Sequence, residues 1–292
     1  MQNGGTPCRG DCERNPNREG TVLRILIVNP NTTEALTSLV VETGRVAAAP
    51  DTELIGLTAR RGFPYISGRA EAQIGGAIAL EMLAEAHAGA DGAIIAAYGD
   101  PGLHGARAMF EIPVVGVSEA AMLTACMLGD RFAIVTFAPA LAAWYRDCVA
   151  IHGLVQRCAG IVAIEQSFSS IVDVQDDNLD ALVALANRTI TDKGADVMIF
   201  AGAPLSGFAT KARSRIPAPI VDPIAAAVKQ VEALVALRPR KAATGSAARP
   251  AAKASVGLPP SLAAYLANAR SPSEEKQRIW CASRSAIQTR SR

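Results

Sequence analysis

Two apolar strands that end on small residues decide the fold, and about one hundred residues separate them. The first reads Gly92-Ala93-Ile94-Ile95-Ala96-Ala97-Tyr98-Gly99-Asp100-Pro101-Gly102-Leu103. The second reads Gly194-Ala195-Asp196-Val197-Met198-Ile199-Phe200-Ala201-Gly202-Ala203-Pro204-Leu205-Ser206-Gly207. Each run stops at small residues and then meets a proline, which is a residue that can open a helix. This repetition predicts two similar halves of one molecule.

Further apolar, β-branched runs lie on either side of these two and alternate with segments of helical periodicity. The runs occupy residues 24–28, 53–57, 93–97, 113–117, 132–137, 160–164, 197–201 and 219–221. Strands that are apolar on both faces and alternate with helices indicate a parallel sheet that is covered on each side. We therefore expect an α/β fold of two pseudo-symmetric lobes, each a parallel sheet flanked by helices, with a central cleft between them.

The same pattern predicts where the lobes begin and end. We expect residues 24–116 and 219–237 to form the first lobe and residues 117–218 to form the second, so that the chain crosses twice beside the cleft. Residues 1–23 are polar and predict a flexible arm. Residues 238–292 are rich in Ala, Pro, Lys, Arg and Ser, and they predict a mostly disordered tail. One short apolar patch at 262–266 is the part of this tail that can form one or two helical turns.

Charge is divided unevenly along the chain. Residues 24–237 carry 15 basic and 22 acidic side chains, a net charge of −7, whereas residues 238–292 carry 11 and 2, a net charge of +9. An acidic globule with a basic tail is not the composition of a nucleic-acid-binding domain. No secretory signal and no apolar stretch of ~18–20 residues is visible. We expect a cytoplasmic protein without a nucleic-acid or membrane partner, and a homo-oligomer is left open.

The six cysteines do not form a pattern that points to a disulfide framework or a metal site. Cys8 and Cys12 stand in the polar arm without further ligands nearby in sequence. Cys126 and Cys148 fall within predicted helices, and Cys158 just precedes a strand. His87 and His152 fall near helix ends and carry no signal of their own. We expect no bound metal.

Polar side chains at the ends of the predicted strands are the candidates for substrate binding. Asn29, Asn31 and Thr32 follow the first strand, and their amides and hydroxyl can bind a carboxylate or an imide carbonyl. The alternative is structural, since Thr32 or Thr33 can cap the helix that begins near Glu34. Ligands of open α/β sheets bind beyond the carboxyl ends of the strands, and that rule adds Gly99, Ser118, Thr136, Ala203 and Ser206.

The first strand end also offers three weak candidates for acid–base chemistry, which are Tyr98, Asp100 and His104. Asp100 stands directly before Pro101, so it is expected to cap the helix that follows, and its functional alternative is a general base. His104 lies one turn into that helix, where it is either a proton shuttle or a surface histidine. Tyr98 either lines the pocket or fills space between the lobes.

Several of these segments, in the same order, resemble the aspartate/glutamate/hydantoin racemase superfamily, and most closely its hydantoin and allantoin racemase branch. They are Ile27-Val28-Asn29-Pro30-Asn31-Thr32-Thr33, Gly99-Asp100-Pro101-Gly102-Leu103, Ile112-Pro113-Val114-Val115-Gly116-Val117, Phe132-Ala133-Ile134-Val135-Thr136 and Gly194-Ala195-Asp196-Val197. The resemblance covers about residues 24–237. It implies an enzyme without a cofactor, in which two thiols face each other across the substrate carbon.

The resemblance places Ala97 and Gly202 where that family carries its two cysteines. The sequence therefore predicts a racemase or isomerase that acts on a small hydantoin, amino acid or related carboxylate by a route without the cysteine pair. Two alternatives stay open. One is a lyase or hydrolase that acts on a small carboxylate or cyclic imide, and the other is a family member that binds a ligand without catalysis.

Overall fold

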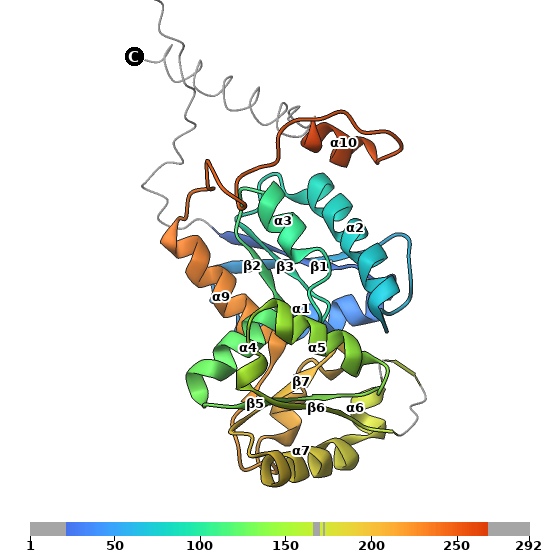
Figure 1. Cartoon of the computed structure of the whole chain (residues 1–292), viewed down its shortest axis with the longest axis vertical. Coiled ribbons are helices and arrows are strands. Elements are labelled where there is room, and N and C mark those ends of the chain that lie inside the picture. The colour runs from blue at the N-terminus through green and yellow to red at the C-terminus, as the bar shows by residue number, and fades with distance from the viewer. Residues whose placement is uncertain (1–21, 166–169, 172, 268–292) are drawn as a thin grey trace, which may run out of the picture.

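The computed structural model describes residues 22–165, 170–171 and 173–267, and it has two lobes stacked end to end (Figure 1). Residues 1–21 of the predicted arm, which include Cys8 and Cys12, and residues 268–292 of the predicted tail lie outside the described residues. No helix among those described is long and apolar enough to cross a membrane.

Each lobe contains a four-stranded parallel sheet. The first is ordered β2-β1-β3-β4 and consists of β1 (Leu23–Asn29), β2 (Thr52–Thr58), β3 (Gly92–Ile95) and β4 (Val114–Gly116). The second is ordered β6-β5-β7-β8 and consists of β5 (Phe132–Thr136), β6 (Cys158–Ala163), β7 (Val197–Ala201) and β8 (Ile220–Val221). Both sheets use the same order of second, first, third and fourth strand, so the predicted pseudo-symmetric α/β fold is confirmed.

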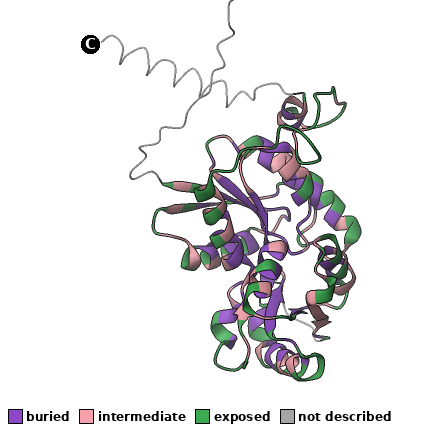
Figure 2. Ribbon diagram, turned by 60° about the vertical axis from the view of Figure 1, so that its left-hand side comes forward, coloured by how far each residue is buried: buried purple, intermediate pink, exposed green. Residues whose placement is uncertain are grey.

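Helices cover both sheets. They are α1 (Glu34–Ala47), α2 (Arg69–Ala86), α3 (Leu103–Met109), α4 (Val117–Leu128), α5 (Leu141–Ile151), α6 (Val174–Asp177), α7 (Leu179–Lys193), α8 (Phe208–Ala212), α9 (Pro223–Leu237) and α10 (Pro260–Leu266), with short 3-10 turns η1 (Val155–Arg157) and η2 (Ala203–Leu205). Figure 2 shows that the strands form the buried interior and that exposed residues follow the outer helical faces.

The β-strand alternation explains the two hydrophobic cores. Ile25 and Ile27 of β1 point into a large core that also contains Ile134 and Ile199 of the second sheet, so the two lobes share it. Leu26 and Val28 point to the opposite face, where they pack with residues of α2 and α3 in a second core. Successive side chains of a strand face opposite sides of the sheet, and here both sides are covered.

The return of the chain to the first lobe differs from the prediction. The strand at 220–221 pairs with β7 through Met198 and Ile199, so it belongs to the second sheet. Only helix α9 returns, and it packs against α1, β3 and β4 of the first lobe as well as α4. The apolar pattern of the strand is the same in either sheet, and only the pairing with β7 decides its place.

The short apolar patch of the predicted tail forms a helix, α10, over residues 260–266. Helix α10 packs on α2, and Leu262 and Tyr265 are buried in the second core. The Tyr265 ring lies 4.7 Å from that of Phe110, and its hydroxyl donates to the Met109 carbonyl at 3.1 Å. The guanidinium of Arg249 lies over the Tyr265 ring, with its central carbon 4.2 Å from the ring centroid. A short patch with one large aromatic is enough because it completes an existing core.

We expect Tyr265→Ala to detach this segment, because Tyr265 is the larger of the two side chains that α10 buries in the core. Limited proteolysis of the variant should cut between residues 238 and 267 and leave the two lobes intact. Tyr265→Phe, which keeps the ring and loses one hydrogen bond, should remain nearly as resistant as the unaltered protein. Equal cleavage of the unaltered protein and of Tyr265→Ala would show that α10 does not stay docked.

Candidate functional site

The two strand ends singled out in the sequence face one cavity between the lobes. Ala97 follows β3 and Gly202 follows β7, which are equivalent strands of the two sheets. Both residues line a cavity of about 30 Å³, which is room for roughly one water. The other lining residues are mainly aromatic or apolar: Asn31, Leu36, Tyr65, Ile66, Tyr98, Phe137, Trp144, Tyr145, Ala203 and Pro204.

Glycine is required on each side of this cavity. Gly99 has φ +101°, and a Cβ there would lie 2.2 Å from the indole of Trp144. Gly202 has φ +113°, and a Cβ there would lie 2.6 Å from the ring of Phe137. Positive φ is accessible to glycine at little cost. The two aromatic rings therefore occupy the space that side chains at positions 99 and 202 would need.

Asp100 caps a different helix from the one expected. Helix α3 begins only at Leu103, with Gly102 before it, and the Asp100 side chain does not cap it. Asp100 has φ +50°, and its carboxylate accepts the backbone N–H groups of Ser118 and Glu119, both at 2.8 Å. These are the second and third residues of α4, so the carboxylate satisfies donors that a helix start leaves open. The sequence could not show this partner, because it lies 18 residues further along.

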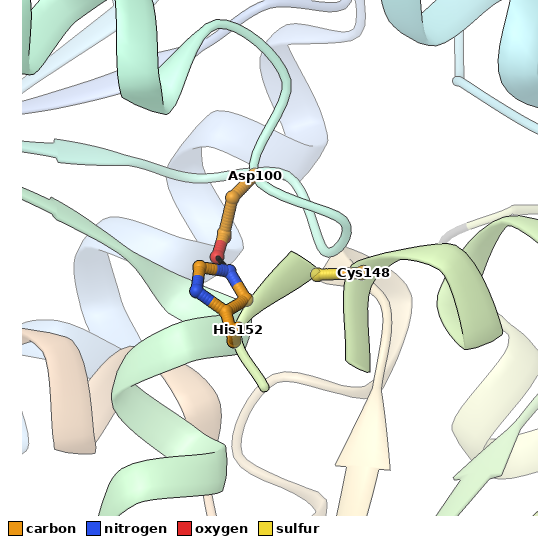
Figure 3. Close-up of side chains that lie close together, drawn as sticks. All are labelled: Asp100, Cys148 and His152. Carbon is orange, nitrogen blue, oxygen red and sulfur yellow. Dashed lines mark ion pairs between the residues drawn. The ribbon is translucent and has the colours of Figure 1, made fainter. Parts of the chain in front are cut away.

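A network of ionic side chains extends from Asp100 into the second lobe. Nε2 of His152 lies 3.5 Å from Oδ2 of Asp100, and Nδ1 lies 3.3 Å from Oε1 of Glu119. Arg107 donates to both oxygens of Glu119, one of them at 2.9 Å. The thiol of Cys148 completes the group, since its sulfur lies within 4.8 Å of the Asp100 and His152 ligand atoms (Figure 3).

These contacts set the protonation of the network. Burial disfavours the charged imidazole of His152, but contact with Asp100, Cys148 and Glu119 outweighs it and raises the pKa to about 11. Burial likewise opposes ionisation of Glu119, but His152 and Arg107 lower its pKa to about 2. Burial raises the pKa of the Cys148 thiol. At neutral pH the network holds an imidazolium between two carboxylates, with a protonated thiol beside it.

Sequence reasoning missed this network. Nothing in the sequence around His152 pointed to a function. It stands four residues after Cys148, however, and residues at that spacing share one helix face. Cys148 belongs to α5, and His152 follows it directly as the C-cap residue. That spacing was the available signal. Neither residue touches the cavity in the described structure, so the pair is not part of its lining.

The two asparagines have different roles. The Asn29 amide is fully used inside the protein, because its nitrogen donates to Asn31 Oδ1 at 3.0 Å and Thr37 Oγ1 at 2.9 Å, and its oxygen accepts from Asn31 N. Asn31 Oδ1 also accepts from Thr33 N at 3.0 Å. This fixes the Asn31 side chain, whose amide nitrogen makes no hydrogen bond to another described residue. Asn31 lines the cavity, and Asn29 holds Asn31 in position.

Most other polar candidates hold the scaffold. The hydroxyl of Ser118 accepts from Gly99 N, and that of Thr136 donates to the Ala201 carbonyl at 3.1 Å. Ser206 is buried beside a separate small recess, His104 is exposed, and Thr32 is half-buried outside the cavity lining. Thr33 precedes α1, but its hydroxyl donates to Pro64 O and caps nothing. Ala203 does line the cavity, with its backbone in η2.

Two buried tyrosines, Tyr98 and Tyr145, line the same cavity as Ala97 and Gly202. Tyr98 and Tyr145 stack at 4.7 Å between ring centroids. Burial raises the pKa of each hydroxyl, so both stay protonated at neutral pH and serve as hydrogen-bond donors. The Tyr98 hydroxyl is buried without a hydrogen-bond partner among the described residues. No cysteine, histidine or carboxylate of the described residues lines this cavity.

The fold and the paired strand ends define a known class. The chain matches the model of the Asp/Glu/Hydantoin racemase family over residues 25–231, and it belongs to that family. It is 28% identical over 219 residues to a hydantoin racemase of Pseudomonas sp. (strain NS671), a match that covers 74% of this chain and 87% of the relative.

Solved structures give the same result. An allantoin racemase from Klebsiella pneumoniae superposes with a TM-score of 0.78 at 33% identity, over 82% of this chain and 98% of that one. An allantoin racemase from Pseudomonas fluorescens superposes with a TM-score of 0.75 at 32% identity, over 80% and 100%. The resemblance seen in the sequence is therefore confirmed at the level of family and fold.

We expect the two strand ends to respond differently to a cysteine. Ala97→Cys adds one atom beside a cavity and should change the free energy of unfolding by less than about 1.5 kcal/mol. Gly202→Cys combines positive φ with contact to Phe137 and should cost about 2–4 kcal/mol. Urea denaturation of both variants measures this, and Phe137→Leu in the Gly202→Cys background should recover part of the loss. Equal stability of the two single variants would contradict the geometry.

Proposed function

We propose that this protein is a cofactor-independent racemase that acts on a small hydantoin-like ring. We further propose that it does not use the two-thiol mechanism that the resemblance to the racemase family implies. Membership of the racemase family supports the reaction class, and the relatives whose names include hydantoin and allantoin support the ring. The single observation that carries the proposal is that Ala97 and Gly202 line the same cavity from equivalent strands. A cytoplasmic location and the oligomeric state stay predictions.

The donors around the cavity suit a planar ring with carbonyl groups. Asn31 presents an amide nitrogen whose position is fixed by hydrogen bonds on its oxygen. Tyr98 adds a protonated phenol without a partner. Loss of the proton from a carbon next to a carbonyl gives an enolate, and fixed donors at the carbonyl oxygen stabilise that charge. In this proposal the lining supplies oxyanion stabilisation, and water transfers the proton because no ionised side chain lines the described cavity.

The cavity must open before such a ring can enter. About 30 Å³ suffices for one water, and a five-membered ring needs several times that space. Tyr65 is 41% exposed at the rim, whereas Trp144 is buried against Gly99. The Tyr65 segment is therefore the part of the lining that can move with the least loss of packing.

Ligand binding without turnover is the second candidate. It is favoured by the absence of an ionised acid or base from the described cavity lining, where Ala97 and Gly202 carry no group that can transfer a proton. Lyase or hydrolase chemistry on a cyclic imide is the third alternative left from the sequence. One experiment with product analysis distinguishes all three.

The experiment follows exchange of the ring carbon–hydrogen bond of allantoin and 5-substituted hydantoins in D₂O by proton NMR. We expect exchange above the buffer rate with the ring intact, and we expect it to survive alkylation of the accessible cysteines, because no thiol lines the described cavity. Binding without exchange identifies the second candidate, and ring-opened or decarboxylated product identifies the third. The proposal would be refuted if none of these compounds bound to the protein or underwent exchange. Loss of exchange on alkylation, with the fold intact, would refute the thiol-free route.

Asn31→Asp tests the fixed donor with almost no change of shape. The aspartate keeps an oxygen that can accept from Asn29 and Thr33, and it replaces the amide donor by an acceptor. We expect affinity for a ring carbonyl ligand to fall by about 1–3 kcal/mol in calorimetry. Thr32→Val, outside the cavity lining, is the matched control and should bind normally. Unchanged affinity of Asn31→Asp would remove Asn31 from the binding site.

A further inference from the structure

Three different metal-ligating groups converge at the junction of the lobes, outside the cavity. They are the carboxylate of Asp100, the thiol of Cys148 and the imidazole of His152, and one ligand atom from each lies within 4.8 Å of the other two (Figure 3). The side chains of Asp100 and His152 are 2% and 6% exposed, and Cys148 is buried. From this geometry we propose that Asp100, Cys148 and His152 bind one Zn²⁺-type divalent cation.

The separation of the donors is close to what zinc requires. Bonds of about 2.0–2.3 Å to N, O and S in a tetrahedral site place the ligand atoms roughly 3.3–3.6 Å apart. Oδ2 of Asp100 and Nε2 of His152 already lie 3.5 Å apart. The sulfur lies within 4.8 Å of each, and it must move closer to both in order to bind the same cation. The cation displaces two protons to solvent, one from Nε2 of His152 and one from the Cys148 thiol, and the resulting thiolate and the Asp100 carboxylate neutralise the divalent charge.

The surroundings orient the imidazole as a ligand. Nδ1 of His152 faces Oε1 of Glu119 at 3.3 Å, and Arg107 holds Glu119 through both carboxylate oxygens. A carboxylate on the far nitrogen fixes the tautomer that leaves Nε2 free for a metal, an arrangement common behind zinc ligands. Asp100 is also held in place, because its oxygens accept from Ser118 N and Glu119 N while each keeps a lone pair.

A proton on His152 can bridge only two of the three ligand atoms. The single N–H at Nε2 of an imidazolium donates to the carboxylate or to the sulfur, whereas a cation bonds to both and to the nitrogen. The site also joins two parts of the fold, since Asp100 belongs to the loop after β3 and the other two ligands stand at the end of α5. Trp144 of the same helix packs on Gly99, so a bound cation would hold this side of the cavity closed. His104 is exposed, and its ring lies 5.8 Å from that of His152, so the site is one side chain away from the surface.

Cobalt substitution tests the site directly in the full-length chain. Cys8, Cys12 and Cys281 are first replaced by serine, so that thiols outside the described residues do not contribute, and the protein is stripped with a chelator. We expect one equivalent of Co²⁺ to bind with a sulfur-to-cobalt charge-transfer band and tetrahedral d–d bands. Cys148→Ser should abolish the charge-transfer band and weaken Zn²⁺ binding at least about tenfold, and Glu119→Gln should weaken it about 10–100-fold.

The controls are Cys126→Ser, Cys158→Ser and His104→Gln, which should bind as the parent does. If Cys148→Ser fails to fold, X-ray absorption at the zinc edge of the parent replaces it and should show one sulfur with nitrogen and oxygen neighbours. The proposal is overturned if one equivalent does not bind, if the spectrum lacks a thiolate band, if Cys148→Ser leaves the band unchanged, or if the zinc shell contains no sulfur. None of these outcomes depends on racemase activity.

Discussion

The carboxylate of Asp100 is the contact on which the arrangement of the site depends. It accepts the N–H groups of Ser118 and Glu119, so it fixes the loop after β3 against the start of α4. These two hydrogen bonds offset the strain of the positive φ at Asp100, because such a backbone costs about 1–3 kcal/mol at a residue other than glycine. Trp144 packs on Gly99 as a result, and Ala97 is turned toward the cavity. One buried carboxylate thus links a turn, a helix start and the lining.

In the second lobe a carboxylate makes an equivalent set of hydrogen bonds, but it stands on the helix side instead of on the loop. Asp222 caps α9 through Ile224 N and Ala225 N, and it also accepts from Gly207 N in the loop after β7 at 2.6 Å. In both lobes a carboxylate therefore ties the loop after the third strand to the helix after the fourth. In the first lobe the carboxylate stands on the loop, and in the second it stands on the helix. The pseudo-symmetry extends from strand order to the hydrogen bonds that position Ala97 and Gly202.

The sequence predicted the fold well because periodicity is a local property. Every strand of the two sheets overlaps an apolar run, and the sheets have the predicted parallel pairing. The site was harder to predict, because its contacts join residues far apart in the chain. Asp100 stands before a proline, as a cap of the following helix would, yet its carboxylate caps α4 instead. His152 is placed in the ionic network by its contacts with Asp100 and Glu119. Strand 220–221 and helix α10 show the same limit, since their partners are β7 and α2.

The two strand ends differ in the room that they leave for a side chain. Ala97 carries a Cβ that points toward the cavity lining, so a sulfur could be added there within the existing packing. At Gly202 the φ of +113° and the ring of Phe137 exclude any side chain unless neighbouring groups move. The phenol of Tyr145 lies on the same side, 3.6 Å from the place a Cβ would take. The strand end of the second lobe is therefore enclosed by aromatic side chains. In the function that we propose, Asn31 and the phenols therefore stabilise developing negative charge, and they leave removal of the proton to water.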